Sequence, residues 1–349
     1  MTNPTVLVTG GAGYIGSHVC KALATQGFTP VAYDNLCSGN AEAVKWGPFE
    51  QGDIRDAARL DEVMAKYKPV ATMHFAALIQ VGGSVPYPAK YYDNNVYGSY
   101  MLLEAGRRHG IKNMVFSSTA AVYGIPEYTP IPESHTLKPI NPYGQTKLVM
   151  EGMIRDYAQA YGFNYTIFRY FNAAGAHPDG DLGGAFKVES HVVPLMMRVA
   201  SGHRPAFSVF GTDYPTADGT AVRDYVHVVD LADAHVRALK HLLKGGESLT
   251  LNLGTNNGNS VREMVELARK VTGTPVPVAE AERRAGDPPA LVADAAKARA
   301  VLGWTPVNSS LENILSTAWA WRQKQNNLGR VGALTGIATF DESEKRSAA

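Results

Sequence analysis

The chain has 349 residues, of which 45% are hydrophobic and 19% are charged, which is typical of a globular protein with a sizeable core. Its formal net charge of +1 gives no field that would attract nucleic acid or an anionic membrane. Two cysteines and ten histidines without ligand spacing argue against a disulfide framework and a metal site, and no apolar run approaches a membrane span, so we expect a cytoplasmic protein.

Short β-branched runs alternate with helical patterns through the first half of the chain. We predict strands at residues 5–9, 29–34, 49–53, 70–76, 113–117 and 165–169. We predict helices between them at residues 15–26, 57–66, 94–109 and 143–161. This alternation is typical of βαβ units and predicts an α/β fold, a Rossmann-type doubly wound parallel sheet.

The second half of the chain is less regular. A loop is predicted over 174–189, and Ser260 with Glu263 forms a capping-box pattern that predicts a helix over 261–271. A final helix is predicted over 311–323. We therefore expect an NAD-binding unit over 1–172 to which about 225–255 returns, a smaller mixed α/β substrate-binding lobe over 173–324, and a flexible tail over 325–349.

Three glycines follow the first predicted strand. Gly10 permits a tight turn, Gly13 lets the backbone approach a pyrophosphate, and Gly16 lets the next helix pack closely on the sheet. The N-terminus of that helix adds N–H groups and a positive dipole end. The pattern predicts a dinucleotide site, and the alternative is a glycine turn with a structural role alone.

An acidic residue, Asp34, ends the second predicted strand. Its carboxylate can accept hydrogen bonds from both adenosine ribose hydroxyls and would repel a 2′-phosphate, which favours NAD over NADP. The alternative role of Asp34 is to cap the turn before Asn35. Further cofactor contacts are expected at the next strand ends: Asp53 and Ile54 near the adenine, and Phe75, Ala76 and Ala77 beside the phosphates.

Tyr143 and Lys147 lie four residues apart, on one face of a predicted helix. A free tyrosine has a pKa near 10, and a neighbouring ammonium favours the phenolate, so the pair could remove a proton from a substrate hydroxyl. Thr119, at the end of the fifth predicted strand, could hydrogen-bond a substrate oxygen. The alternatives are a chance spacing for the pair and a strand-end cap for Thr119.

With these residues the chain resembles the extended short-chain dehydrogenase/reductase family, and within it the enzymes that epimerise UDP-sugars. The resemblance covers about residues 4–323 and is carried by motifs at 9–16, 34–36, 74–77, 91–96, 116–119, 143–147, 169–172, 223–227 and 284–287. It implies that a bound NAD takes hydride from C4 of the sugar while a tyrosine takes the O4 proton. The resulting 4-keto sugar turns over and receives hydride on its other face, so that UDP-galactose and UDP-glucose interconvert.

The resemblance also implies a role for each matching residue. Tyr143 is the base, Lys147 its electrostatic partner and Thr119 the third member. The residues expected to bind the cofactor are Gly10, Gly13, Tyr14, Ile15, Gly16, Asp34, Asn35, Asp53, Ile54, Phe75, Ala76, Ala77, Asn94, Lys147, Tyr170 and Phe171. Those expected to bind the UDP-sugar are Thr119, Tyr143, Asn172, His191, Phe210, Arg223, Arg284, Asp287 and Leu291. A homodimer is also implied.

The chain departs from the family pattern at several positions. Thr119 replaces a serine but keeps the hydroxyl, and Ile79 stands where some relatives have a lysine near the cofactor. Leu291 lies where residue size admits or excludes a 2-N-acetyl group, and leucine leaves that choice open. Ala120 and Ala121 replace the acidic residues of dehydratases and decarboxylases and disfavour both reactions. The alternatives that remain are a 4-epimerase of a UDP-N-acetylhexosamine, pentose or hexuronate, and an inactive NAD-binding regulator.

Overall fold

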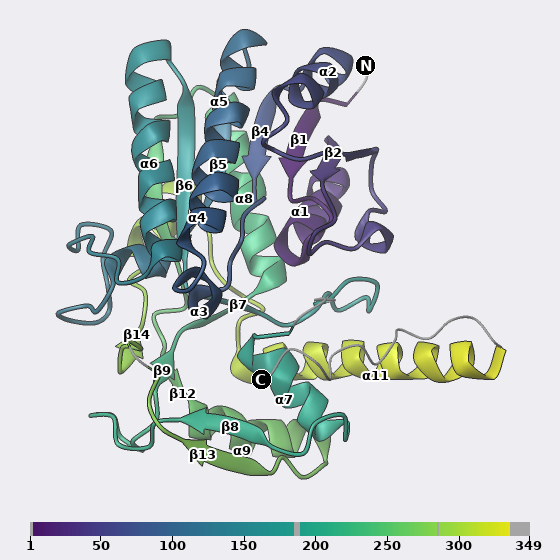
Figure 1. Ribbon diagram of the computed structural model, residues 1–349, viewed down its shortest axis with the longest axis vertical. Helices are drawn as coiled ribbons and strands as arrows, with labels where there is room; N and C mark the ends of the chain where they lie inside the picture. The colour runs from purple at the N-terminus through teal and green to yellow at the C-terminus, as the bar shows by residue number, and fades with distance from the viewer. Residues whose placement is uncertain (1–2, 185–188, 285, 336–349) are drawn as a thin grey trace.

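A seven-stranded sheet forms the larger of two lobes in the computed structural model, which describes residues 3–184, 189–284 and 286–335 (Figure 1). The strand order is β11-β6-β5-β4-β1-β2-β3, and all six pairings are parallel. The strands are β1 (Thr5–Thr9), β2 (Thr29–Asp34), β3 (Phe49–Gln51), β4 (Ala71–His74), β5 (Asn113–Thr119), β6 (Asn164–Tyr170) and β11 (Leu249–Leu253). The Rossmann-type prediction is confirmed.

Helices cover both faces of this sheet (Figure 1). One buried cluster joins the sheet to α1 (Tyr14–Thr25), α8 (Val228–Leu243) and α10 (Ala296–Leu302). The other joins it to α2 (Ala57–Tyr67), α5 (Gly98–Arg108) and α6 (Pro142–Tyr161). Local sequence sets the start of α6, because the Asn141 side chain accepts a hydrogen bond from the Gly144 N–H at 2.8 Å and Pro142 is the first helical residue.

The helix predicted over 94–109 differs from the observed structure. The chain forms α3 (Val81–Ser84), α4 (Pro88–Tyr91) and a π-helix, η2 (Tyr92–Tyr97), before α5 begins at Gly98. The wider π-turn is frequent at functional sites. Two predicted strands also end early, β3 at Gln51 and β4 at His74, so their final residues lie in loops at the carboxyl edge of the sheet.

The smaller lobe consists of short sheets and three helices. Its helices are α7 (Val192–Ala200), α9 (Val261–Thr272) and α11 (Leu311–Thr335), which share one buried cluster. The predicted capping box of α9 is confirmed, with both reciprocal hydrogen bonds between Ser260 and Glu263. The strand pairs are β7 (Asn172–Ala174) with β10 (Tyr225–His227), β8 (Phe207–Phe210) with β13 (Val278–Ala281), and β9 (Val222–Arg223) with both β12 (Asn259–Ser260) and β14 (Ala290–Leu291).

The final helix is longer than the predicted 311–323. α11 continues to Thr335 and extends away from the body of the molecule (Figure 1). Apolar residues at its start, Ile314, Leu315 and Ala318, are buried against α7 and α9. The rest of the predicted tail, 336–349, lies outside the described residues. No helix among the described residues is long and apolar enough to span a membrane.

Candidate active site

The glycine loop between β1 and α1 has the geometry of a phosphate cradle. Gly10 has a φ of 74°, and a Cβ there would lie 2.7 Å from the Ala76 nitrogen. A Cβ at Gly16 would lie 2.2 Å from the Gly10 carbonyl oxygen, so only glycine permits this packing. A Cβ at Gly13 would meet only that carbonyl, at 3.1 Å. The outer side of the loop is therefore open to a pyrophosphate at the N-terminus of α1.

The Asp34 carboxylate lies against this loop at the end of β2. It accepts hydrogen bonds from the N–H groups of Ala12 at 3.1 Å and Leu36 at 2.8 Å. Asn35 donates to Asp53 at 2.9 Å, and ion pairing with Arg55 lowers the pKa of Asp53. These anionic groups fit the ribose and adenine end of NAD and disfavour a 2′-phosphate.

The other predicted cofactor residues are distributed along the carboxyl edge of the sheet. Ala76 adjoins Gly10, and the ring of Phe75 packs 4.9 Å from that of His235. The Tyr14 hydroxyl donates to the Gly175 carbonyl oxygen at 2.6 Å. Ile15 and Ile54 are mainly core residues: Ile15 packs against the α1–α8 cluster, and Ile54 packs against Gly98. The exposed Ile79 offers no polar group.

Tyr143, Lys147 and Thr119 come together where α6 begins beside the end of β5. Tyr143 and Lys147 are both buried, in the first two turns of α6. The Lys147 ammonium donates to the Ser117 carbonyl oxygen at 2.8 Å, which fixes it to β5 two residues before Thr119. Thr119 also hydrogen-bonds Tyr143 and accepts from the Ala121 N–H at 3.1 Å. The three residues thus form one unit at the same sheet edge as the glycine loop.

Burial dominates the protonation of this unit. It raises the pKa of Tyr143 to about 12, although the Thr119 hydrogen bond acts in the opposite direction. It lowers the pKa of Lys147 to about 7, although the charge of Glu151 raises it. Desolvation of the buried phenolate therefore outweighs the favourable contacts and holds the Tyr143 pKa above its ordinary value.

A buried chain of hydrogen bonds connects this unit to Leu78, in the loop that follows β4. Thr146, one residue before Lys147, donates to the Tyr143 carbonyl oxygen at 2.7 Å and accepts from Asn95 of the π-helix at 3.2 Å. Asn95 also binds the backbone of Leu78 and is contacted by Asn94 at 2.9 Å. Asn94, a predicted cofactor residue, is thereby held by a neighbour that the sequence analysis did not select.

Arg223, Asp287 and Leu291 meet in the smaller lobe. The Arg223 guanidinium forms an ion pair with Asp287, and Arg223 is the register partner of Leu291 across β9 and β14. Phe171 and Leu291 both pack against the cluster around Ala120 and Val122, directly after Thr119. Leu291 therefore lies close to the chain segment that carries the reacting groups.

The remaining predicted substrate residues lie on separate elements of the smaller lobe. The Arg284 guanidinium stacks on the Phe210 ring at 3.9 Å, at the end of β8. His191 is the N-cap residue of α7, with its Nδ1 3.1 Å from a Glu189 carboxylate oxygen. Asn172 begins β7, where its N–H donates to the Asp224 carbonyl oxygen at 3.1 Å. Tyr170 lies next to the catalytic unit through a hydrogen bond with Ser117.

Two tyrosines beside Arg223 were not selected from the sequence. Among the described residues, the hydroxyls of Tyr214 and Tyr225 are buried without a hydrogen-bond partner. Burial raises the pKa of both hydroxyls, that of Tyr225 to about 12, and the charges of Arg223 and Asp287 also act on both. Orphaned buried hydroxyls next to an arginine fit a polar anionic ligand such as a diphosphate. The motif at 223–227 contains Tyr225, so the signal was present.

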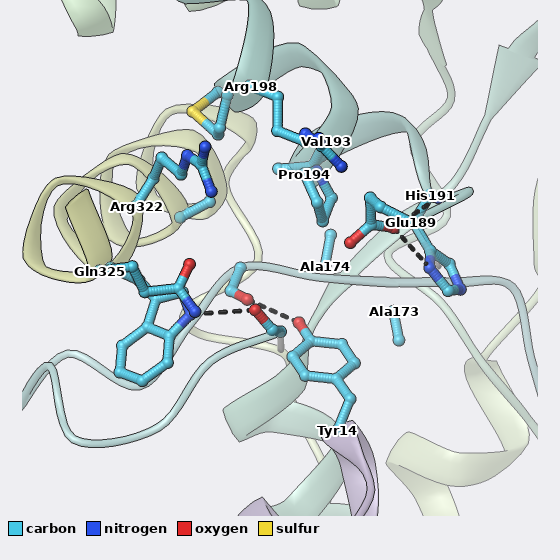
Figure 2. A pocket seen from close by; sticks show the side chains of 15 residues that line it. Tyr14, Ala173, Ala174, Glu189, His191, Val193, Pro194, Arg198, Arg322 and Gln325 are labelled. Atoms are coloured by element: carbon cyan, nitrogen blue, oxygen red, sulfur yellow. Dashed lines mark hydrogen bonds and ion pairs between the residues drawn. The ribbon is translucent and has the colours of Figure 1, made fainter. Parts of the chain in front are cut away.

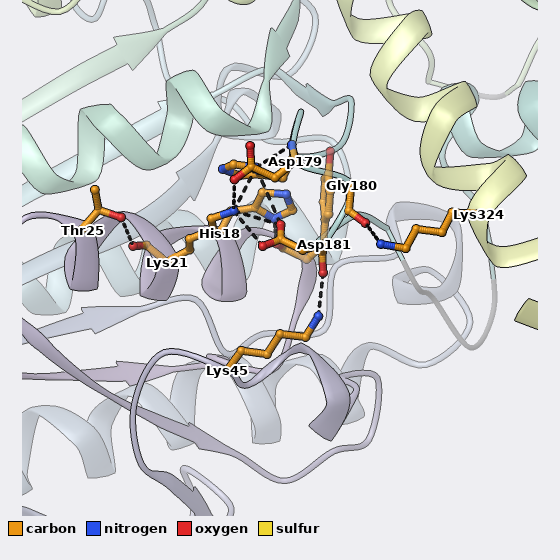
Figure 3. Close-up of polar contacts among 10 residues, drawn as sticks. His18, Lys21, Thr25, Lys45, Asp179, Gly180, Asp181 and Lys324 are labelled. Atoms are coloured by element: carbon orange, nitrogen blue, oxygen red, sulfur yellow. Dashed lines mark hydrogen bonds and ion pairs between the residues drawn. The ribbon is translucent and has the colours of Figure 1, made fainter.

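A cluster of one histidine and two aspartates has side chains of the kind that bind a metal ion, but a lysine lies among them (Figure 3). His177, Asp179 and Asp181 have ligand atoms within 4.8 Å of one another. The Lys21 ammonium of α1 is 2.7 Å from Asp179, 2.8 Å from Asp181 and 3.1 Å from His177. Lys21 thus supplies the cation, and the contacts fasten the loop after β7 to the cofactor-binding helix.

Comparisons with known proteins agree with this geometry. A model of the NAD dependent epimerase/dehydratase family matches residues 6–254. UDP-glucose 4-epimerase of Rhizobium meliloti (strain 1021) is 54% identical over 329 residues, covering 94% of this chain and 100% of that protein. The solved structure of UDP-glucose 4-epimerase from Brucella ovis in complex with NAD is 53% identical, with a TM-score of 0.89 over 90% of this chain and 97% of that chain. A Stenotrophomonas maltophila UDP-glucose-4-epimerase with bound NAD and formylated UDP-arabinopyranose is 41% identical, with a TM-score of 0.90 over 93% and 99%.

Proposed function

Because this chain belongs to the NAD dependent epimerase/dehydratase family, we propose that it is an isomerase that interconverts UDP-galactose and UDP-glucose at C4 with tightly bound NAD. The observation that carries the proposal is the position of Tyr143, with Thr119 and Lys147, at the sheet edge that also bears the glycine loop. Its relatives' names and the ligands in their structures give the same substrate class.

Tyr143, Thr119 and Lys147 have different roles in the proposed reaction. Tyr143 takes the O4 proton as the C4–H bond breaks, and returns a proton to O4 when hydride comes back to the opposite face. Thr119 donates a hydrogen bond that favours the phenolate. Lys147, one turn later in α6, supplies the positive charge in our proposal. NAD would be held by the loop from Gly10 to Gly16 and by Asp34, and it would supply reversible acceptance of the hydride from C4. Ala120 and Ala121 provide no acid for elimination of water.

We assign the UDP group to the smaller lobe. Arg223 and Arg284 supply guanidinium groups suited to a diphosphate, and the Tyr214 and Tyr225 hydroxyls lie beside Arg223. Asp287 forms an ion pair with Arg223, and the Arg284 guanidinium stacks on the Phe210 ring. Firm binding of UDP leaves the hexose free to turn over between the two hydride transfers.

The direct test is turnover by the protein as purified. We expect bound NAD after purification and conversion of UDP-galactose to UDP-glucose without added cofactor. Rates for UDP-N-acetylgalactosamine, UDP-arabinose and UDP-galacturonate would define the sugar that Leu291 admits. Bound NAD with no turnover of any of the four UDP-sugars would contradict the proposal and support an NAD-binding regulator.

We also propose a homodimer formed through α5 and α6. Tyr100 of α5 and Tyr161 of α6 are 41% and 46% exposed, and Tyr157 lies between these helices with its hydroxyl on Glu104 at 2.7 Å. Exposed aromatic side chains on adjoining helices are typical of interfaces. Sedimentation velocity should give the mass of two chains for the wild type and a larger monomer fraction for Tyr100→Glu. A monomeric wild-type protein at micromolar concentration would contradict this assembly.

A further inference from the structure

His74, at the end of β4, joins the strand before the glycine loop to the π-helix. The hydroxyl of Thr9, the last residue of β1, lies 2.6 Å from Nδ1 of His74. Nε2 of the same ring lies 2.8 Å from the Ser99 hydroxyl, near the start of α5. Ser99 donates its hydroxyl hydrogen to the Asn95 carbonyl oxygen at 2.5 Å. One imidazole ring thus links β1 to the π-helix and α5.

The hydrogen bonds continue from Asn95 to the reacting groups. The Asn95 side chain donates to the Thr146 hydroxyl at 3.2 Å, and Thr146 donates to the Tyr143 carbonyl oxygen at 2.7 Å. At the other end, Thr9 directly precedes Gly10 of the phosphate cradle. The two ends of this set are therefore the loop assigned to the cofactor and the first turn of α6, which carries the base.

The directions of these hydrogen bonds define the tautomer of His74. Ser99 has one hydroxyl hydrogen and donates it to the Asn95 carbonyl, so its oxygen accepts from the Nε2–H of His74. Burial and the charge of Lys147 lower the pKa of His74 to about 3, so the ring carries a single proton at neutral pH. Nδ1 is therefore unprotonated and accepts from the Thr9 hydroxyl.

Thr9, His74, Ser99, Asn95 and Thr146, here called the His74 network, are enclosed by the protein. Each is at most 3% exposed. The described residues that line the cavity of about 170 Å³ between β7, α7 and α11 are all different ones (Figure 2). Burial of five polar side chains costs free energy that an apolar core would avoid. Because the network is closed to ligands, it can act only through the residues at its two ends.

The His74 ring also lies near Lys147, with one aromatic ring between them. The His74 ring is 5.7 Å from the Phe116 ring, and the Lys147 ammonium is 5.0 Å from the centre of that ring. A protonated imidazole would place a second positive charge near Lys147, and the neutral tautomer does not. The neutral ring can therefore hold this part of the site together without opposing the charge of Lys147.

We propose that His74 is a positioning residue for C4 epimerisation, a role that rests on the function proposed above. As the Nε2–H tautomer, it holds the glycine loop, through Thr9, at a set distance from the turn of α6 that carries Tyr143. A displacement of about 1 Å at a reacting centre can lower a rate about 100-fold. Loss of the network should therefore lower kcat, while binding of the UDP-sugar in the smaller lobe persists.

Two substitutions at Thr9 separate its hydroxyl from its shape. Thr9→Val keeps the branched shape and removes the donor to His74, so kcat for UDP-galactose should fall about 10- to 100-fold. KM and the NAD content of the purified protein should be nearly unchanged. Thr9→Ser keeps the hydroxyl and should recover most of the activity. Thr166→Val is the matched control, because Thr166 is buried in β6 of the same sheet and its hydroxyl has no hydrogen-bond partner among the described residues.

Ser99→Ala breaks the network at a second point and introduces a good helix former. Alone it should lower kcat as Thr9→Val does. Because both changes break the same network, the double variant should lose much less activity than the product of the two single effects. Unrelated structural damage at the two positions would instead multiply the losses, and that result would contradict the proposal.

Nitrogen NMR spectra of histidine-labelled protein test the network without turnover. The resonances absent from His74→Gln identify His74, and we expect a protonated Nε2 and an unprotonated Nδ1. A protonated Nδ1, or an active wild type whose Thr9→Val variant turns over as fast as Thr166→Val, would overturn the inference. A wild type inactive on all four UDP-sugars would contradict the proposed function and this role with it, and the spectra would still decide whether the network exists.

Discussion

Replacement of Tyr143 by phenylalanine should lower kcat by about 10²–10⁴-fold, the contribution typical of a positioned acid–base group. The ring is buried at the start of α6, and phenylalanine preserves its packing. What is lost is the hydroxyl that hydrogen-bonds Thr119 and exchanges a proton with O4. The binding of NAD and of UDP should persist, because the glycine loop and the arginines of the smaller lobe are not altered.

The measurement is steady-state turnover of UDP-galactose, with NAD content and UDP affinity determined on the same preparation. Tyr157→Phe is the matched control: it removes a tyrosine hydroxyl from the same helix, one that binds Glu104 at the helix surface. We expect that variant to retain nearly full activity. If Tyr143→Phe turns over as fast as Tyr157→Phe, Tyr143 is not the base.

The sequence predicted the frame of this site well because the relevant signals are local. Close backbone contacts require glycine at positions 10 and 16, and Asp34 ends a strand whose bounds were correct. A side-chain cap and a proline mark the start of α6, and the capping box marks α9. Such signals depend on neighbouring residues, so they can be read without knowledge of the fold.

The features that were missed depend on residues far apart in the chain. The π-helix places Asn95 against Leu78 and Thr146, which no helical periodicity could indicate. The pKa of Tyr143 depends on how deeply the folded chain buries the phenol, and the helical pattern cannot reveal that depth. The unpaired hydroxyls of Tyr214 and Tyr225 lie beside Arg223 and Asp287 only in the folded smaller lobe, because three separate segments of the chain carry these residues.

The burial of Glu151 is another feature that the sequence did not predict, and its loss should have the largest effect on stability. A charged residue in a helical pattern is usually exposed, yet Glu151 is fully buried one turn after Lys147. It accepts hydrogen bonds from Ser118 at 2.6 Å and from Arg169 at 2.9 and 2.7 Å. Arg155 donates to it from the solvent side at 2.8 Å. Glu151 therefore joins α6 to the end of β5, on which Lys147 and Thr119 depend.

Glu151→Gln should lower the free energy of unfolding by about 3–5 kcal/mol, as expected when one partner of a buried ion pair is removed. The amide would present N–H groups to the donors of Arg169 and leave that guanidinium buried without its counter-charge. Chemical denaturation at neutral pH measures the loss. Glu266→Gln, which breaks an exposed pair with Arg269 on α9, is the control and should cost no more than about 0.5 kcal/mol.

The two protonation effects of this substitution have defined signs. Burial raises the pKa of Glu151, but the hydrogen bonds and charge of Arg169 outweigh it and hold that pKa below its ordinary value. The stability that Glu151 contributes is therefore present above its unfolded pKa, and the difference from Glu151→Gln should shrink as the pH falls below about 4.

The catalytic effect follows from Lys147: burial lowers its pKa to about 7, and the charge of Glu151 opposes this shift. Without that charge the pKa of Lys147 falls further. In a plot of activity against pH, the change in activity that reports loss of the lysine proton should therefore move to lower pH. A pH–rate profile of kcat/KM separates this effect from a loss of folded enzyme, which lowers activity without moving that change along the pH axis. An unshifted pH–rate profile together with unchanged stability would show that Glu151 neither fixes β5 to α6 nor acts on Lys147.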